Sequence, residues 1–131
     1  MNISNIVPNS LEAEQSIIGS IIIDPASING IVELIKPIHF YNRSHSIIYT
    51  AMTEMIASKH PVDLITLSDY LERKNLLEEA GGFVYLADIS KNTPSSANAI
   101  AYCNTVIDRW NGRQILSACH SGADMVREGK C

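Results

Sequence analysis

The residues best suited to catalysis or metal binding are four histidines and three cysteines, in a chain of 131 residues. His39 and His45 stand on either side of a turn pattern, whereas His60 and His120 are isolated. No carboxylate or thiol lies near any of them at metal-ligand spacing, and the cysteines form no Cys-x-x-Cys pair. We therefore predict no metal site and no catalytic histidine, and we expect His45 to be a packed, hydrogen-bonded residue.

Acidic residues could serve as general acids or bases, but their positions favour structural roles. Asp63 stands at the start of a helical pattern and is expected to cap it. Glu12 and Glu14 are two residues apart on one predicted helix, so their side chains point to different sides and cannot act together on one substrate. In the first turn of that helix they favour the positive end of its dipole. The alternative is that they contact a partner protein.

A phosphate-binding loop of the form Gly-x-x-x-x-Gly-Lys-[Ser/Thr] is absent from the sequence. The backbone amides of such a loop bind the phosphates, so no residue elsewhere in the chain replaces it. We therefore predict that this chain neither binds nor hydrolyses ATP and needs no cofactor.

Composition predicts an aliphatic core and an acidic first part. Hydrophobic residues make up 46% of the chain and aromatic residues 6%. Residues 1–108 carry a net charge of −6 and residues 109–131 carry +2, which argues against a surface that neutralises phosphates. No apolar run is long enough to cross a membrane and no secretory signal opens the chain, so we expect a cytoplasmic location and no membrane partner.

Helical periodicity recurs in every apolar segment, and no segment alternates apolar and polar residues as a strand would. The sequence predicts an all-α fold, a compact bundle of short helices in residues 1–95 followed by one long helix. The expected helices run from Asn9 or Ser10 to near Asp24, over about 25–35, over about 43–58 after an Asn42 cap, from Asp63 onward, after Gly81-Gly82, and over about 96–129.

Two of these segments yield specific expectations about burial. The second helix should bury Ile28, Val32 and Ile35. In the segment after Gly81-Gly82, Phe83 recurs with other apolar residues at helical spacing and should face the core. Tyr85, two residues further, is then the candidate for an exposed aromatic anchor that binds a partner.

The long helix carries two apolar stripes. The first consists of Ile100, Cys103, Val106, Ile107 and Trp110, and the second of Ile115, Leu116, Cys119, Ala123 and Val126. Nine residues separate Trp110 from Cys119, which is two and a half turns, so the second stripe faces away from the first. We expect the first stripe to pack on the bundle, and both Cys103 and Cys119 to be small buried residues. The second stripe should be covered by another copy or by a following helix of a longer protein. Gly112, a mid-helix glycine that costs roughly 1 kcal/mol relative to alanine, leaves open whether the helix breaks there.

Three groups of residues together resemble the amino-terminal domain of DnaB-type replicative DNA helicases. The first is Gly81-Gly82-Phe83-x-Tyr85-Leu86-Ala87-x-Ile89-x-x-Asn92-Thr93-Pro94-Ser95-x-Ala97-Asn98, followed by Tyr102, Val106 and Arg109. The second is Pro8-x-Ser10-x-Glu12-Ala13-Glu14-Gln15-Ser16-x-x-Gly19. The third contains Phe40-Tyr41, His45, Ile48, Met52 and the run Pro61 to Leu67. The resemblance covers roughly residues 8–110.

The resemblance implies a non-catalytic domain that pairs subunits in a helicase ring and docks primase or a helicase loader during DNA replication. Residues 96–131 would be the first arm of a truncated helical hairpin, through which the chain dimerises and the longer protein forms a hexamer. The motor domain, which would bind ATP, Mg and DNA, is absent from this sequence. Candidate partner-binding residues are Glu12, Tyr85 and Leu116, and candidate self-association residues are Ile115, Leu116, Cys119 and Val126.

Two other functions remain open at this point. A small helical nucleic-acid-binding domain would need a short basic recognition helix, whereas the helices of the first 95 residues are acidic. A small all-α enzyme would need a convergent acid, base or nucleophile, and the sequence offers none.

Overall fold

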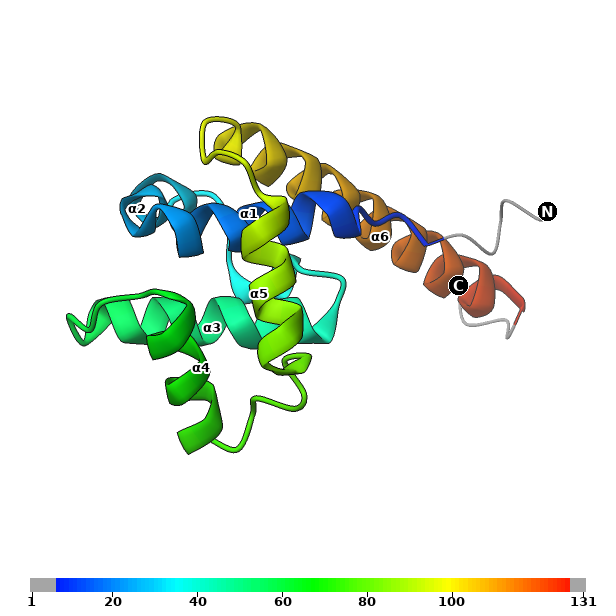
Figure 1. Cartoon of the computed structure of the whole chain (residues 1–131). Helices are drawn as coiled ribbons and strands as arrows, with labels where there is room; N and C mark the ends of the chain where they lie inside the picture. The colour runs from blue at the N-terminus through cyan, green and yellow to red at the C-terminus, as the bar shows by residue number, and fades with distance from the viewer. Residues whose placement is uncertain (1–6, 128–131) are drawn as a thin grey trace.

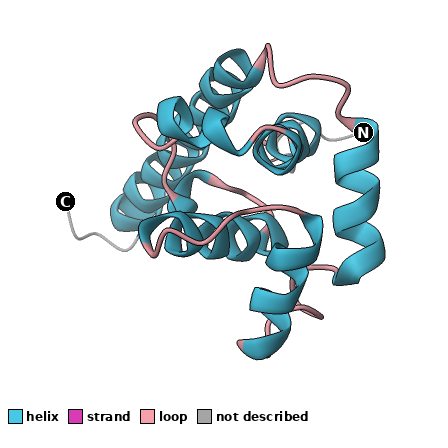
Figure 2. Ribbon diagram, turned by 60° about the vertical axis from the view of Figure 1, so that its left-hand side comes forward, coloured by secondary structure: helices cyan, strands magenta, loops and turns pink. Residues whose placement is uncertain are grey.

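The computed structural model describes residues 7–127, with side chains as far as Ala123. Within this part, the chain forms helices and loops and no strand (Figure 2), which confirms the all-α prediction. The helices are α1 (Leu11–Ile23), α2 (Ile28–Ile31), α3 (Arg43–Ala57), α4 (Leu64–Arg73), α5 (Gly82–Asn92) and α6 (Ala99–Arg127). Two 3-10 turns cover Pro25–Ser27 and Pro37–His39. Helices α1 to α5 form a head, and α6 runs along α1 and extends beyond it (Figure 1).

Helix α1 is the central element of the head, because it packs against α3, α5 and α6. Its buried residues lie all round the helix and not along one stripe, as expected of a helix enclosed by others. Ile17, Ile18 and Ile21 have no exposed surface. Burial of such side chains contributes about 1.5–3 kcal/mol each. The dense run of isoleucines is therefore what allows one helix to serve as a core for three neighbours.

Three helices begin at the polar residues that the sequence predicts. The Ser10 hydroxyl accepts a hydrogen bond from Ala13 N at 3.3 Å. The Asn42 side chain accepts from Ser44 N at 2.8 Å, and the Asp63 carboxylate accepts from Thr66 N at 2.8 Å. Each bond satisfies a backbone donor that the first turn of a helix leaves free. The capping predictions are confirmed.

The second predicted helix is shorter than expected. A 3-10 turn follows Pro25 and only Ile28–Ile31 is α-helical. Ile28 and Ile35 are buried as predicted, but Val32 is 42% exposed and Ile31 is fully buried. The α-helix ends at Ile31 and a turn follows, so the helical period that selected Val32 does not continue to Ile35, and Ile31 faces the core in place of Val32.

The turn before α5 depends on the glycine pair. Gly81 has a φ of +106° and Gly82 a φ of +85°, a region that residues with a Cβ rarely adopt. A Cβ on Gly81 would also lie 2.5 Å from the Tyr85 ring. Both glycines are therefore required where they stand, and the predicted sharp turn is confirmed.

Helix α6 is continuous through Gly112, so the helix does not break at that glycine. A Cβ on Gly112 would lie 3.3 Å from the Pro8 ring, which shows how closely the segment before α1 crosses α6. The next residue, Arg113, donates hydrogen bonds to the carbonyl oxygens of Pro8 and His39, both at 2.8 Å, and its guanidinium lies 5.3 Å from the centre of the Tyr41 ring. Arg113 thus fastens α6 to the head about halfway along its length.

The end of α5 passes close to the backbone of α1 at Gly19. A Cβ built there would come within 2.7 Å of Thr93 Cβ and 3.1 Å of the Ile89 carbonyl oxygen. The Thr93 hydroxyl donates to that same carbonyl at 2.9 Å, so the end of α5 has little freedom to move away. The absence of a side chain at Gly19 allows α5 to cross α1 at this distance.

Replacing Gly19 by alanine is expected to lower the free energy of unfolding by roughly 1–3 kcal/mol, the usual cost of overpacking a core. The added methyl group would have to displace Thr93 or the backbone of α5. Urea denaturation followed by circular dichroism, at one fixed protein concentration, measures the change.

Gly122→Ala is the matched control, because nothing lies within 4 Å of a Cβ at that exposed helical position. Alanine favours a helix over glycine by up to about 1 kcal/mol, so this variant should be as stable as the unmodified protein or more so. Equal stabilities for the two variants would contradict the close approach of α1 and α5.

Candidate functional site

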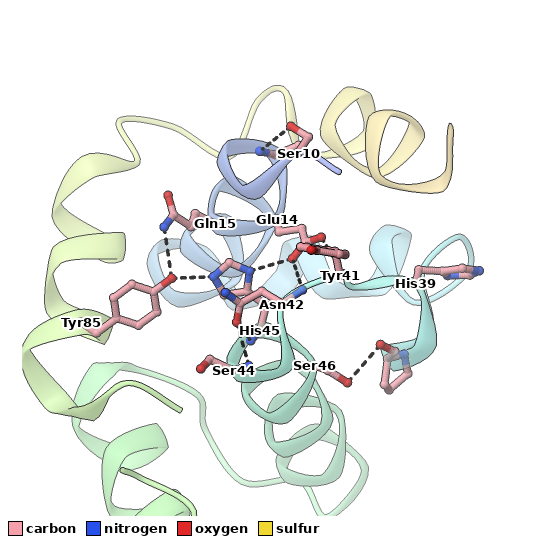
Figure 3. A network of polar contacts seen from close by, with 12 residues as sticks. Ser10, Glu14, Gln15, His39, Tyr41, Asn42, Ser44, His45, Ser46 and Tyr85 are labelled. Carbon is pink, nitrogen blue, oxygen red and sulfur yellow. Dashed lines mark hydrogen bonds and ion pairs between the residues drawn. The ribbon is translucent and has the colours of Figure 1, made fainter. Parts of the chain in front are cut away.

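A chain of hydrogen bonds crosses the interior of the head and joins α1, α3 and α5 (Figure 3). His45 of α3 is its centre. Its Nδ1 lies 2.8 Å from Oε1 of Glu14, and its Nε2 lies 2.6 Å from the Tyr85 hydroxyl oxygen. Gln15 Nε2 donates to that same oxygen at 3.1 Å. His45 is fully buried, so the prediction of a packed, hydrogen-bonded histidine is confirmed.

Glu14 is 1% exposed, which corrects the expectation that Glu14 only complements the helix dipole or contacts a partner. Its carboxylate accepts hydrogen bonds from the backbone N–H groups of Tyr41 at 2.8 Å and Asn42 at 3.2 Å, in addition to His45. The loop before α3 passes over α1 and needs acceptors for these two donors, because buried N–H groups without partners are costly. The residue types around Glu14 do not indicate this role, since the donors belong to the backbone of a segment distant in sequence.

A groove of about 460 Å³ lies between α1 and α5, directly beside the end of this chain. Glu12, Gln15 and Tyr85 line it, and α6 contributes Tyr102. The other lining residues are Ser16, Asp88, Ile89, Asn92 and Thr93. The structure therefore brings together two of the three predicted partner-binding residues, Glu12 and Tyr85, in one polar groove.

The predicted orientations of the two aromatic residues on α5 are reversed. Phe83 is 43% exposed, whereas Tyr85 is only partly exposed and packs its ring parallel to the His45 ring at 6.0 Å. Phe83 lies one turn before the buried Leu86, and Tyr85 lies one turn before the buried Ile89, so the helical period alone does not decide which of the two faces the core. The hydrogen-bonded chain from Glu14 and His45 determines that residue 85 faces inward, because the Tyr85 hydroxyl can bond to His45 whereas the phenyl ring of Phe83 cannot. Tyr85 is thus a packed residue on the wall of a groove and not a free anchor.

The third candidate, Leu116, lies away from the groove. It is fourteen residues after Tyr102 on α6, roughly 21 Å at 1.5 Å per residue. Leu116 is half-buried, Ile115 is 66% exposed, and Cys119 is exposed, which corrects the expectation of a buried Cys119. The side chain of Val126 lies outside the described residues. Of the second stripe, therefore, Ile115 and Cys119 are exposed in the described part of the chain.

The first stripe packs on the head as expected, with one exception. Cys103 and Val106 are buried, Ile107 is partly buried against the core, and Trp110 is partly buried, but Ile100 is 45% exposed. Burial raises the pKa of the Cys103 thiol to about 11. Cys103 is thus a buried structural residue, whereas the side chain of Cys119 is exposed.

Trp110 contacts the 3-10 turn through His39, at 5.0 Å between ring centres and nearly perpendicular. Nδ1 of His39 accepts a hydrogen bond from Lys36 N at 2.9 Å. Burial, followed by the positive charges of Lys36 and Arg113, lowers the pKa of His39 below its ordinary 6.5. The folded protein therefore favours the neutral form of His39, which is the form that keeps this acceptor.

Two other kinds of site are absent from the described part of the chain. Among residues with described side chains, no three His, Cys, Asp or Glu groups lie close enough to hold a metal ion. Within the same part of the chain, no helix is sufficiently long and apolar to cross a membrane.

Comparison with protein families gives one match over most of the chain. The model of the DnaB-like helicase N terminal domain matches residues 6–108. Among curated proteins, the replicative DNA helicase DnaB of Pasteurella multocida is 42% identical over 116 residues, which cover 88% of this chain and 25% of that protein. The protein of the same name from Buchnera aphidicola subsp. Baizongia pistaciae is 44% identical over 110 residues, 84% of this chain and 24% of that one. The chain thus spans about a quarter of the length of these relatives.

Solved structures agree with this match. The crystal structure of the N-terminal domain of DnaB helicase from Mycobacterium tuberculosis superposes with a TM-score of 0.90 at 28% sequence identity, covering 95% of this chain and 89% of that one. A structure described as a DnaB-like replicative helicase and its interactions with primase gives a TM-score of 0.75 at 27% identity, covering 90% of this chain and 28% of that one.

Acidification is expected to disturb the contact between His39 and Trp110, the only tryptophan in the chain. Because the pKa of His39 is lowered in the folded state, its contribution to stability is fully present above pH 6.5 and is lost as the pH falls below that value. Tryptophan fluorescence between pH 8 and pH 5 should show a change with its midpoint below 6.5, since an imidazolium beside an indole quenches its emission.

His39→Gln serves as the control, because it keeps a polar side chain at position 39 but cannot titrate. This variant should show no such change. A midpoint at or above 6.5 in the unmodified protein, or an identical titration in His39→Gln, would contradict the assignment.

Proposed function

The chain belongs to the family of DnaB-like helicase N-terminal domains, and we propose that it is a non-catalytic module that pairs subunits and docks partner proteins of a replicative DNA helicase. Residues 1–95 form the docking head, and residues 96–131 form the first arm of a helical hairpin. The ATP- and Mg-dependent motor, through which DNA would be engaged, belongs to other parts of the longer protein. We place the protein in the cytoplasm, where a bacterial replicative helicase meets DNA.

The observation that carries this proposal is the division of α6 at Arg113. Up to Arg113 the helix is bonded to the head, and beyond it Ile115 and Cys119 are exposed. Apolar surface removed from water contributes about 25 cal/mol per Å², so an exposed isoleucine beside a half-buried leucine favours association. We propose that a second copy covers this stripe, as a dimer of this chain and within a hexameric ring of the longer protein.

Docking is proposed at the groove between α1 and α5. Glu12 and Tyr85 line it together, and one structural neighbour is described as interacting with primase. A preformed groove, held by buried hydrogen bonds, loses little conformational entropy when a partner binds. We propose primase as the main partner of this groove, and a helicase loader as a second protein that docks on the same head. Leu116, distant from the groove, is assigned to subunit pairing.

The first expected outcome concerns subunit pairing. The unmodified chain should be a dimer at high micromolar concentration, and the double variant Ile115→Lys, Leu116→Lys should be a monomer with unchanged helix content. Two buried ammonium groups would oppose association, whereas neither side chain belongs to the core of the head. Light scattering with a mass measurement distinguishes the two states.

Ile65→Lys is the matched control, since Ile65 is 67% exposed on α4 and lies outside the proposed interface. Its mass should equal that of the unmodified protein. Cys119 gives an independent readout, because its labelling by a thiol reagent, located by peptide mapping, should slow as protein concentration rises. Cys103, with its pKa of about 11, should resist labelling throughout. An unmodified protein that stays monomeric at high micromolar concentration would contradict the pairing.

The second expected outcome concerns docking. Glu12→Arg should weaken binding of a carboxy-terminal fragment of the cognate primase by about 1–2 kcal/mol, the usual effect of losing a well-placed interface residue. Glu12 is exposed and makes no hydrogen bond through its carboxylate within the described part of the chain, so the variant should fold normally. Titration calorimetry measures the affinity.

Glu33→Arg makes the same change of charge at an exposed position that does not line the groove. It controls for the general effect of charge on association and should leave the affinity within twofold of the unmodified protein. Equal affinities for the two variants would move the docking site away from the groove.

A further inference from the structure

We propose that Glu14 and His45 are positioning residues that fix the direction of the Tyr85 hydroxyl, so that the groove presents a hydrogen-bond acceptor at Tyr85 to a docked partner. The inference rests on the proposed function, because it concerns the groove at which docking is placed. It adds that two buried residues, neither of which lines the groove, determine which chemical group the groove accepts there.

The hydrogen positions follow from Glu14. Its carboxylate receives the N–H groups of Tyr41 and Asn42, and an ionised carboxylate only accepts hydrogen bonds. The 2.8 Å contact between Glu14 and Nδ1 of His45 therefore requires a hydrogen on Nδ1. Histidine chemistry links the two ring nitrogens, because in the neutral ring the nitrogen without hydrogen accepts. We propose this neutral ring for His45, in which Nε2 is the acceptor that faces Tyr85.

Tyr85 completes the assignment. Its oxygen receives a hydrogen bond from the Gln15 amide, so its own hydrogen needs an acceptor. Within the described part of the chain, the acceptor in reach is Nε2 of His45, at 2.6 Å. The Tyr85 hydrogen therefore points into the head. The remaining lone pair of the oxygen can only accept, and Tyr85 and Gln15 both line the groove.

Three further groove residues, Glu12, Asp88 and Thr93, also present hydrogen-bond acceptors. Glu12 and Asp88 line the groove with exposed carboxylates, which accept at neutral pH. The Thr93 hydroxyl uses its hydrogen on the Ile89 carbonyl. A partner that enters the groove therefore meets acceptors at these positions, and the group that contacts Tyr85 should be an N–H donor on the partner protein.

Glu14→Gln is designed to reverse this chain without altering the groove wall. A glutamine amide has the shape of the carboxylate but offers N–H where Glu14 offers oxygen. Oε1 of Glu14 contacts both His45 Nδ1 and Asn42 N. If the glutamine N–H takes the place of this oxygen, the hydrogen bond from Asn42 N is lost, the N–H donates to Nδ1 of His45, and the ring hydrogen moves to Nε2 and donates to Tyr85. The Tyr85 hydrogen is then displaced toward the groove, and an acceptor becomes a donor.

The test combines spectroscopy of the free protein with binding of the carboxy-terminal primase fragment. Long-range ¹H–¹⁵N spectra should show His45 of the unmodified chain with hydrogen on Nδ1, and His45 of Glu14→Gln with hydrogen on Nε2. Affinity for the fragment should fall about tenfold in Glu14→Gln and in Tyr85→Phe, because each removes the acceptor or opposes the donor that meets it. Helix content should be unchanged in both.

Tyr102→Phe is the matched control, since Tyr102 also lines the groove and its hydroxyl makes no hydrogen bond among the described residues. Its affinity should stay within twofold of the unmodified protein. A residue that merely stabilises the fold would change neither the tautomer of His45 nor the affinity of a folded variant.

The inference is overturned if the free protein carries the hydrogen on Nε2 of His45. It is equally overturned if Tyr85→Phe binds the fragment as tightly as the unmodified protein, a result that does not depend on Glu14→Gln folding. Failure of the proposed function gives a different result from failure of the inference, because the fragment would then bind neither the unmodified protein nor Tyr102→Phe. In that case the tautomer spectra still decide the direction of the hydroxyl.

Discussion

A single buried carboxylate determines how the head is assembled. Glu14 lies on the most enclosed helix of the domain, and it accepts hydrogen bonds from two backbone N–H groups and from His45. Leaving a buried polar group without its hydrogen-bond partner usually costs about 1–3 kcal/mol. α1, the loop before α3, and α3 itself can therefore pack in only one register. Since Tyr85 is bonded to the far side of the same imidazole, α5 follows that register as well.

Helix α6 is held to the head by hydrogen bonds from a cationic donor, Arg113. Arg113 reaches two backbone carbonyl groups, those of Pro8 and His39, from segments that lie far apart in the sequence. An arginine suits this position because its rigid guanidinium donates in several directions at once. The fastening holds the first half of α6 against the head and leaves the second half to project, so the same helix is part of the core at Cys103 and has exposed residues at Ile115 and Cys119. This arrangement separates the exposed residues of the second half of α6 from the groove between α1 and α5.

Much of the fold could be predicted from the sequence, because caps and periodicity are local. Asn42 and Asp63 accept hydrogen bonds from backbone atoms within three residues of themselves, so their roles as helix caps can be deduced from the neighbouring residues in the sequence. The errors occur where the deciding partner is distant. Phe83 and Tyr85 exchange roles because a histidine forty residues earlier selects the phenol, and Glu14 is buried because the backbone of residues 41 and 42 needs it. Nearly every residue has a backbone N–H group, so the residue types do not show which of these groups needs a buried acceptor. The hydrophobic periodicity therefore could not predict the burial of Glu14.

The same geometry bears on the alternative of nucleic-acid binding by the head. A phosphate group needs N–H donors or cations, whereas the groove is bordered by the carboxylates of Glu12 and Asp88 and belongs to a segment with a net charge of −6. Bringing a phosphate there would add repulsion to the loss of its hydration. A protein surface that carries lysine, arginine or free amide groups would instead be attracted to the groove, since its donors could bond to the carboxylates of Glu12 and Asp88. The electrostatics of the groove and the hydrogen-bond direction that we propose therefore both favour a protein partner over a nucleic acid at this groove.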